Sequence, residues 1–262
     1  MSTLTRRLED RIIQIIFHEF RDVIDFMITL IQYPRGQKIP SISPFCLKLE
    51  TYLKAAQVPY DNKLTVSTAK TSKKKLPVIL DGQKLIEDSS FIIEHLQQKY
   101  QIDLDKDLTN EQKAVTQSFK WLCERNIVNI VMWFRWADEK NWPLFREQIF
   151  AGAPWLVKVT IANKMANKVK KDLWGMGIGR FTDAERIHIL RQDLKSLSDF
   201  LGDKKFFFGE KIHTLDIIVF ATLAQIEYSS VTPQLAPLLL EFPNLQKHVH
   251  KIMQTYWSDY LS

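Results

Sequence analysis

The chain is poor in cysteine and has no long apolar run. Of its 262 residues only Cys46 and Cys123 are cysteines, too few for a disulfide framework, and nothing resembles the spacing of zinc ligands. No stretch approaches the roughly eighteen apolar residues of a membrane span. The first residues, MSTLTRRLEDR, lack the apolar segment and cleavage site of a secretory signal. We therefore expect a reduced, cytoplasmic protein with no metal site and no transmembrane segment.

A strong charge excess is absent as well. The 36 basic and 30 acidic residues leave a formal charge of +6. The lysine clusters at 73–75 and 168–171 lack the interleaved aromatic residues of a base-stacking surface, so we expect solvated surface and no nucleic-acid partner. Lys75 is the exception, because it directly precedes Leu76-Pro77 and could attract an anionic ligand.

Residues 1–26 predict an amphipathic helix. Apolar side chains recur at helical spacing over 4–26, and charges fill much of the other face. Acidic residues interrupt this helix, so docking on the protein or on a partner is favoured over a membrane surface.

From residue 27 the pattern changes to short strands and helices. Strands are predicted at 27–33, 62–66, 76–80 and 83–86, with a hairpin turn at Asp81-Gly82 between the last two. Ser43-Pro44 opens a helix over 44–56, since a serine N-cap before a proline is a strong start signal. Asp88 caps another helix that reaches residue 100. This order predicts a thioredoxin-like domain over residues 27–104.

The second half has the pattern of an all-helical domain over residues 105–262, which makes the fold class α+β. Capping boxes begin at Thr109 and Thr182, and Asp216 is expected to accept backbone N–H groups at a helix start as a folding device. The helices are predicted at 110–138, 142–172, 183–201, 215–229 and 243–257.

Three local signals of the first domain could hold one ligand. The Ser43 hydroxyl lies on the positive end of a helix dipole, beside free N–H groups that stabilise an anion. Leu76-Pro77 could be a cis bond that presents the backbone of Leu76 to a peptide-like ligand. Asp88-Ser89 begins a helix and suits a ligand carboxylate. Taken singly, Ser43 and Asp88 are better explained as helix caps, the commoner role.

Cys46 lies one turn into the helix that Ser43 opens. It occupies the second cysteine position of a Cys-x-x-Cys motif in which Ser43 replaces the first. Dithiol exchange is therefore not available to this pair, and a buried structural thiol is favoured. A thiol transferase that uses Cys46 as a secondary thiol is a weaker alternative, because it requires an exposed thiol of lowered pKa.

The aromatic residues Trp133 and Trp136 could line an apolar pocket for a second substrate. Packing at a domain interface is the alternative. Arg180, which follows Gly-Ile-Gly, could contact an anion in this pocket or cap the preceding helix. Arg135 and Asp138 are three residues apart and predict an ion pair on the helix surface.

Together these residues resemble a known family. Residues 27–100 are similar to the N-terminal domain of glutathione transferases, with Leu76-Pro77 at the cis-proline and Asp88-Ser89 at the γ-glutamyl position. Ser-Pro-Phe at 43–45 resembles the serine motif of tau-class transferases. SPFCLKLE at 43–50, Gly-Ile-Gly-Arg at 177–180 and Thr-Leu-Asp at 214–216 resemble the failed-axon-connections (Fax) and metaxin-like branch. The likeness covers roughly residues 27–257.

The resemblance implies a homodimeric, detoxifying enzyme that transfers the thiol of glutathione, its co-substrate, to a hydrophobic electrophile. Ser43 would be the catalytic, thiol-activating residue, and the residues implied to bind glutathione are Lys75, Leu76, Pro77, Asp88 and Ser89. Gln32 occupies the slot of the tyrosine in tyrosine-type transferases, so Tyr33 is not expected to be catalytic. The alternative is a non-catalytic Fax-like or metaxin-like scaffold, since a fold does not guarantee an activity.

Overall fold

The computed structural model describes residues 28–261. The amphipathic helix expected over residues 1–26 lies outside the described residues. None of the described helices is long and apolar enough to cross a bilayer.

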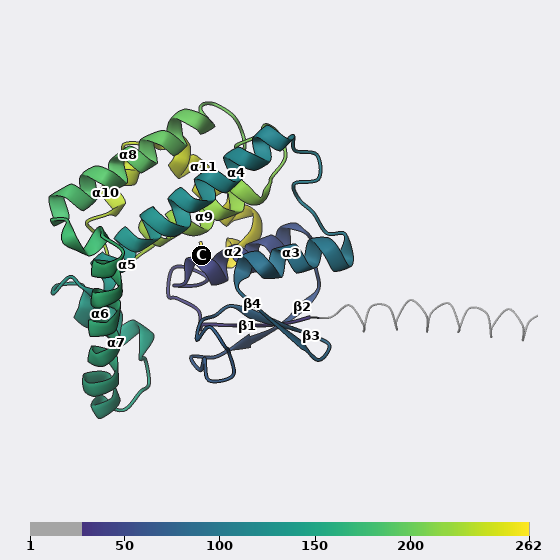
Figure 1. Cartoon of the computed structure of the whole chain (residues 1–262). Coiled ribbons are helices and arrows are strands. Elements are labelled where there is room, and N and C mark those ends of the chain that lie inside the picture. The colour runs from purple at the N-terminus through teal and green to yellow at the C-terminus, as the bar shows by residue number, and fades with distance from the viewer. Residues whose placement is uncertain (1–27, 262) are drawn as a thin grey trace, which may run out of the picture.

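The first domain is a four-stranded sheet with two helices against it (Figure 1). The strand order is β2-β1-β3-β4, with β2 parallel to β1 and the β3–β4 hairpin antiparallel. This is the thioredoxin-like arrangement that the sequence predicts. The elements are β1 (Ile28–Gln32), α2 (Pro44–Ala55), β2 (Tyr60–Leu64), β3 (Val78–Asp81), β4 (Lys84–Glu87) and α3 (Ser89–Tyr100).

The second domain contains helices throughout, which confirms the predicted α+β class. Two long predicted helices are interrupted: a π-helical turn divides the first, and the segment 150–154 divides the second. The helices are α4 (Asn110–Trp121), η1 (Leu122–Ile127), α5 (Val128–Trp136), α6 (Trp142–Ile149), α7 (Trp155–Gly175), η2 (Ile178–Arg180), α8 (Asp183–Leu201), α9 (Thr214–Glu227), α10 (Ala236–Leu240), α11 (Pro243–Tyr256) and η3 (Ser258–Tyr260).

Helix α9 joins the two domains because thirteen of its side chains are buried. Most of them belong to the core of the helical domain, whereas Ile217 packs with Leu49 and Tyr52 in the core beneath the sheet. Fully burying a side chain of this size stabilises the fold by about 1.5–3 kcal/mol. The two cores therefore share one helix, which holds α2 at a defined place on the helical domain.

The linker between α3 and α4 is tied to the start of α9. Asp105 accepts the backbone N–H of Thr214 at 2.9 Å, and Asp107 lies 3.1 Å from Nε2 of His213. His213 stands where Ser or Thr is usual in this cap, and its side chain bonds Asp107 instead of the helix. The second bond of the capping box is present, because the Asp216 carboxylate accepts the backbone N–H of His213 at 2.8 Å.

Candidate functional site

The first two turns of α2 contact the two other predicted parts of the site. Cys46, in the first turn of α2, packs against Leu76 of the cis Leu76-Pro77 bond. Two residues further along α2, Nζ of Lys48 lies 3.3 Å from Oγ of Ser90, in the first turn of α3. The fold thus brings the start of α2, the cis-proline loop and the start of α3 together, as one peptide-like ligand would require.

The start of α2 keeps unused donors. Ser43 is the N-cap, and its half-buried Oγ accepts the N–H of Cys46 at a long 3.4 Å. Pro44 has no N–H, and the N–H of Phe45 has no partner among residues 28–261. As an acceptor in that bond, the Ser43 hydroxyl can still donate its own hydrogen to an anion. The helix dipole favours negative charge at the same place.

The loop before Ser43 is held from the helical domain. Arg135 on α5 donates Nη1 to the carbonyl of Ile42 at 2.9 Å, and Gln225 on α9 donates Nε2 to the carbonyl of Ser41 at 3.1 Å. Arg135 is buried and has no carboxylate partner in the described part of the chain, so burial lowers its pKa to about 10. Two domains therefore share the task of placing Ser43.

The prediction of an ion pair between Arg135 and Asp138 is wrong, because both side chains bind other groups. Arg135 turns inward to the carbonyls of Ile42 and Gln225. Asp138 instead accepts the backbone N–H groups of Lys140 and Asn141 with Oδ1, which caps the turn before α6.

A buried carboxylate holds the other part of the same loop. Glu50 on α2 receives two bonds from Arg35, at 2.5 and 2.7 Å, and one from Tyr60 at 2.9 Å. Gln32 also donates to Glu50, at 2.6 Å. The side chain in the usual tyrosine slot is therefore bound to this internal network and faces no ligand.

The start of α3 offers a second set of donors. Asp88 is the N-cap, with a positive φ of 82°, and its Oδ1 accepts the N–H of Ser90 at 2.9 Å. The N–H and hydroxyl of buried Ser89 have no partner in the described residues. Lys75 is exposed in the loop before Leu76-Pro77. These groups are suited to a carboxylate, and their role in binding stays a prediction.

The two thiols are buried and unpaired. Burial is the main cause that raises the pKa of Cys46 to about 11, and it also raises the pKa of Cys123. The thiolate of Cys46 is therefore scarce near neutral pH, and its sulfur is inaccessible.

The residues predicted for a second-substrate pocket make separate contacts within the protein. Trp136 is buried in a cluster where it stacks on Trp142 at 5.3 Å between ring centroids. Trp133 lies half buried under the guanidinium of Arg186, 3.7 Å from its ring centroid. Arg180 donates Nε to the carbonyl of Trp174 at 3.2 Å, the contact expected of a helix cap.

A buried ion pair across the domain interface was not predicted. Lys48 on α2 donates to Glu124 of the π-helical turn at 2.5 Å, and burial lowers the pKa of Lys48. π-Helical turns occur often at functional sites. The two residues are 76 positions apart, and no local pattern could have paired them.

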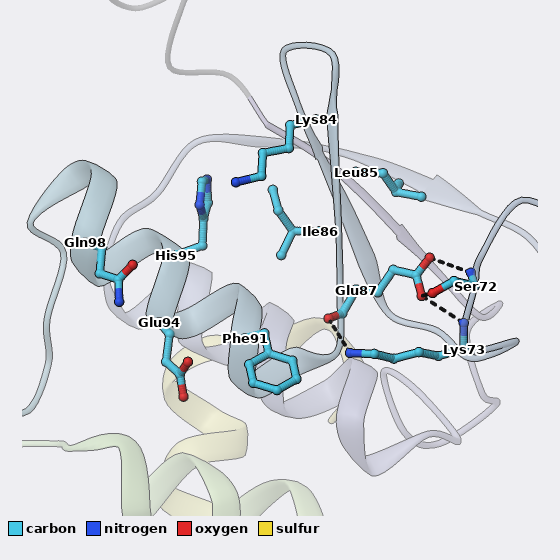
Figure 2. Close-up of a pocket in the computed structure, with 10 residues that line it drawn as sticks. All are labelled: Ser72, Lys73, Lys84, Leu85, Ile86, Glu87, Phe91, Glu94, His95 and Gln98. Carbon is cyan, nitrogen blue, oxygen red and sulfur yellow. Dashed lines mark hydrogen bonds between the residues drawn. The ribbon is translucent and has the colours of Figure 1, made fainter.

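A surface groove of about 450 Å³ lies between β4 and α3 (Figure 2), and Ser43 is not among the residues that line it. The Glu87 carboxylate at its edge accepts the N–H groups of Ser72 and Lys73 at 2.6 and 3.0 Å, so the protein itself fills this anion-binding turn. The groove is lined by Ser72, Lys73, Lys84, Leu85, Ile86, Glu87, Phe91, Glu94, His95 and Gln98. Residues 28–261 hold no group of three His, Cys, Asp or Glu side chains that could bind a metal ion.

Known proteins resemble both halves of the chain. Residues 44–141 match the glutathione S-transferase N-terminal domain, and residues 190–252 match the glutathione S-transferase C-terminal domain. A crystal structure of a glutathione S-transferase from Ceriporiopsis subvermispora in complex with glutathione has the same fold. Its TM-score is 0.62 at 17% identity, and the match covers 88% of this chain and 97% of that one.

Three curated relatives are informative. "Failed axon connections" of Drosophila melanogaster is 33% identical over 89% of this chain and 59% of its own length, so the chain spans about three fifths of that relative. Isoprene-epoxide–glutathione S-transferase of Rhodococcus sp. is 30% identical over 88% of this chain and 99% of its own length. Human metaxin-2 is 23% identical over 88% of this chain and 89% of its own length. The chain therefore belongs to the glutathione S-transferase superfamily, within its Fax- and metaxin-like branch.

Proposed function

We propose that the chain binds glutathione and transfers its thiol to a hydrophobic electrophile. The observation that carries this proposal is the start of α2, where the Ser43 hydroxyl and the Phe45 N–H keep hydrogen-bonding capacity for an anion. A hydroxyl donor and a helix dipole both stabilise a thiolate over a thiol. Lowering the thiol pKa by one unit raises the thiolate fraction near neutral pH about tenfold.

In the proposed reaction the thiol proton leaves to solvent and the sulfur attacks the electrophilic carbon. A carbon–sulfur bond forms, and the leaving group departs with its electron pair, or an opened epoxide oxygen takes a proton. The attacking sulfur belongs to glutathione, because Cys46 is buried and its pKa of about 11 keeps it protonated. The relative that names isoprene epoxide supports an electrophile of the epoxide class.

The rest of the ligand is assigned to the neighbouring segments. We assign the backbone of Leu76 to the cysteinyl peptide groups of glutathione, and Ser89 with Asp88 to its γ-glutamyl end. Exposed Lys75 supplies positive charge nearby. Exposed Leu85 and Phe91 at the groove between β4 and α3 offer apolar surface for the partner copy of a homodimer. A cytoplasmic location also stays a prediction.

A second candidate is a non-catalytic scaffold, and the packing of Trp136 favours it. The Trp136 ring packs against Trp142 and Phe145 and is buried, so it does not face an open substrate pocket. The similarity to Fax and metaxins supports the same candidate. The two functions differ in one measurable respect, which is turnover that depends on the Ser43 hydroxyl.

The test is Ser43→Ala in the full chain, assayed for conjugation of glutathione to an epoxide and to a chloronitrobenzene. We expect kcat/KM to fall on the order of tenfold or more, because the thiolate loses its donor. Retention on immobilised glutathione should persist. If neither wild type nor variant binds glutathione, the scaffold function holds and the transferase function is excluded.

The matched control is Thr109→Ala. Thr109 caps α4 in the same way, with Oγ1 accepting the N–H of Gln112 at 3.2 Å, but α4 begins outside the candidate site. Both substitutions should cost about 1 kcal/mol of stability. Only Ser43→Ala should lose turnover, and equal losses of turnover would reduce Ser43 to a helix cap.

A further inference from the structure

Exposed apolar side chains gather on one part of the helical domain. Of sixteen large hydrophobic side chains exposed in the described residues, eight lie within residues 144–181. This segment contains most of the hairpin of α6 and α7, which projects away from the other helices (Figure 1). The eight are Leu144, Trp155, Leu156, Ile161, Met165, Trp174, Met176 and Phe181.

The tip of the hairpin has the composition of a membrane-inserting loop. Residues 149–157, Ile-Phe-Ala-Gly-Ala-Pro-Trp-Leu-Val, carry no charge. Trp155 and Leu156 are 74% and 62% exposed, at the first turn of α7. A tryptophan at such a tip suits the boundary between lipid headgroups and acyl chains, where its ring has both apolar and polar partners.

The same segment carries most of the net positive charge of the chain. Residues 144–181 contain seven basic and two acidic residues, a net of +5 out of the formal +6. Lys158 and Lys168 have acidic partners, Glu147 and Asp172. The other lysines of α7 are Lys164, Lys170 and Lys171. None of these three lysines forms an ion pair within residues 28–261.

Charge and apolar groups alternate around α7. At about 3.6 residues per turn, Lys164, Lys168 and Lys171 form one stripe, with Ile161 and Met165 on one side of it and Leu156 on the other. A partner protein would need a contiguous apolar face or groove. A lipid surface accommodates this mixture, because lysines reach the headgroups while apolar side chains enter between them.

We propose that the α6–α7 hairpin docks the protein reversibly on anionic lipid membranes, with Trp155 and Leu156 inserted and the lysine stripe of α7 on the headgroups. Negative headgroup charge complements the net positive charge of the segment. The candidate thiol site is formed by other elements, so this docking does not depend on the proposed activity.

The test is co-sedimentation of the full chain with vesicles. Wild type should bind vesicles of equal parts phosphatidylcholine and phosphatidylserine on the order of tenfold more tightly than pure phosphatidylcholine, and added salt should reverse the difference. Trp155→Ser with Leu156→Ser should lower the partition coefficient on the order of tenfold. Lys164→Gln with Lys171→Gln should do so for the anionic vesicles only.

Matched controls lie elsewhere on the surface. Leu240→Ser changes a leucine of similar exposure, 61%, on α10, and Lys113→Gln with Lys247→Gln removes two exposed lysines from α4 and α11. These controls should change vesicle binding by less than about twofold. Absence of wild-type binding to the anionic vesicles, or equal losses in the controls, would overturn the proposal. Loss of self-association in the Trp155 variant with unchanged vesicle binding would also overturn it and assign the hairpin to a contact between copies.

Discussion

The first turns of α2 and α9 begin with similar signals but differ in what their backbone donors contact. At α9 the Asp216 carboxylate accepts the N–H groups of Phe207 and His213, both at 2.8 Å, and Asp105 accepts the N–H of Thr214. At α2 the N–H of Ser43 donates to Oγ of Ser41 at 3.2 Å and the N–H of Cys46 to Oγ of Ser43 at a long 3.4 Å, whereas the N–H of Phe45 has no partner in the described residues. A buried carboxylate closes the start of α9, whereas only side-chain hydroxyls accept the N–H groups at the start of α2.

Helix termini in this fold are stabilised in two ways. A buried terminus must satisfy its N–H groups internally, because each unpaired donor costs about 1–3 kcal/mol. A terminus at the surface can leave donors to solvent and later exchange that solvent for an anion. The buried terminus therefore serves stability, and the half-buried one at α2 keeps an N–H group that an anion could use.

The largest expected effect is that of Asp216→Ala. It leaves the buried N–H groups of Phe207 and His213 without an acceptor, so the free energy of unfolding should fall by roughly 3–5 kcal/mol. Ser43→Ala should lose only about 1 kcal/mol. Urea denaturation followed by circular dichroism measures both. Equal losses would break the distinction between a closed and an open helix start.

A pH effect of similar size should come from His248, beside the closed start. Its Nε2 donates to the Asp216 carbonyl at 3.2 Å, and burial lowers its pKa from 6.5 to about 4. Between these values the unfolded chain binds a proton that the folded chain does not. The contribution of His248 is therefore complete above pH 6.5 and falls by about 3 kcal/mol as the pH drops to 4.

The measurement is the difference in unfolding free energy between wild type and His248→Gln, followed from pH 7 to pH 4. Titrating groups that do not contact His248 act in both proteins and cancel in this difference, whereas burial raises the pKa of the neighbouring Asp216, 3.9 Å away, to about 7. The difference should shrink by about 3 kcal/mol on acidification. A constant difference would mean that His248 takes up its proton as readily in the folded protein as in the unfolded chain.

A smaller effect should reach the open start through Arg135. Arg135→Met frees the carbonyl of Ile42, so the loop before Ser43 loses one of its supports, and kcat/KM should fall on the order of fivefold. The matched control is Arg186→Met, since Arg186 also donates to two carbonyls, of Ile178 and Gly179, at 3.0 and 3.3 Å. Both variants should lose stability, and only the first should lose turnover.

The smallest expected effect is that of Cys46→Ala. The thiol is buried and its pKa is about 11, so turnover should stay within about twofold of wild type. A chromogenic disulfide reagent should label Cys46 slowly in the folded protein and rapidly in urea. Loss of activity together with fast labelling would move the nucleophile from bound glutathione to the protein.

Much of the fold follows from local signals. The bounds of α8, Asp183–Leu201, agree with the predicted helix because a capping box begins it and a glycine ends it. The hairpin of β3 and β4 and the cis bond at Leu76-Pro77 were also expected. β2 begins two residues earlier than expected, because its pairing aligns Tyr60 with Ile28. The break at 150–154 had a visible Gly-Ala-Pro signal that apolar periodicity on both sides obscured.

The sequence alone determined the order of elements, the family resemblance and the residues that begin each main helix, since caps and periodicity act within a few positions. Tertiary structure decided which helix starts are closed and which are open. Arg135, Gln225 and Glu124 meet the segment around Ser43 from 76 to 184 positions away. Contacts over such separations depend on how buried surfaces pack, and no local pattern encodes them.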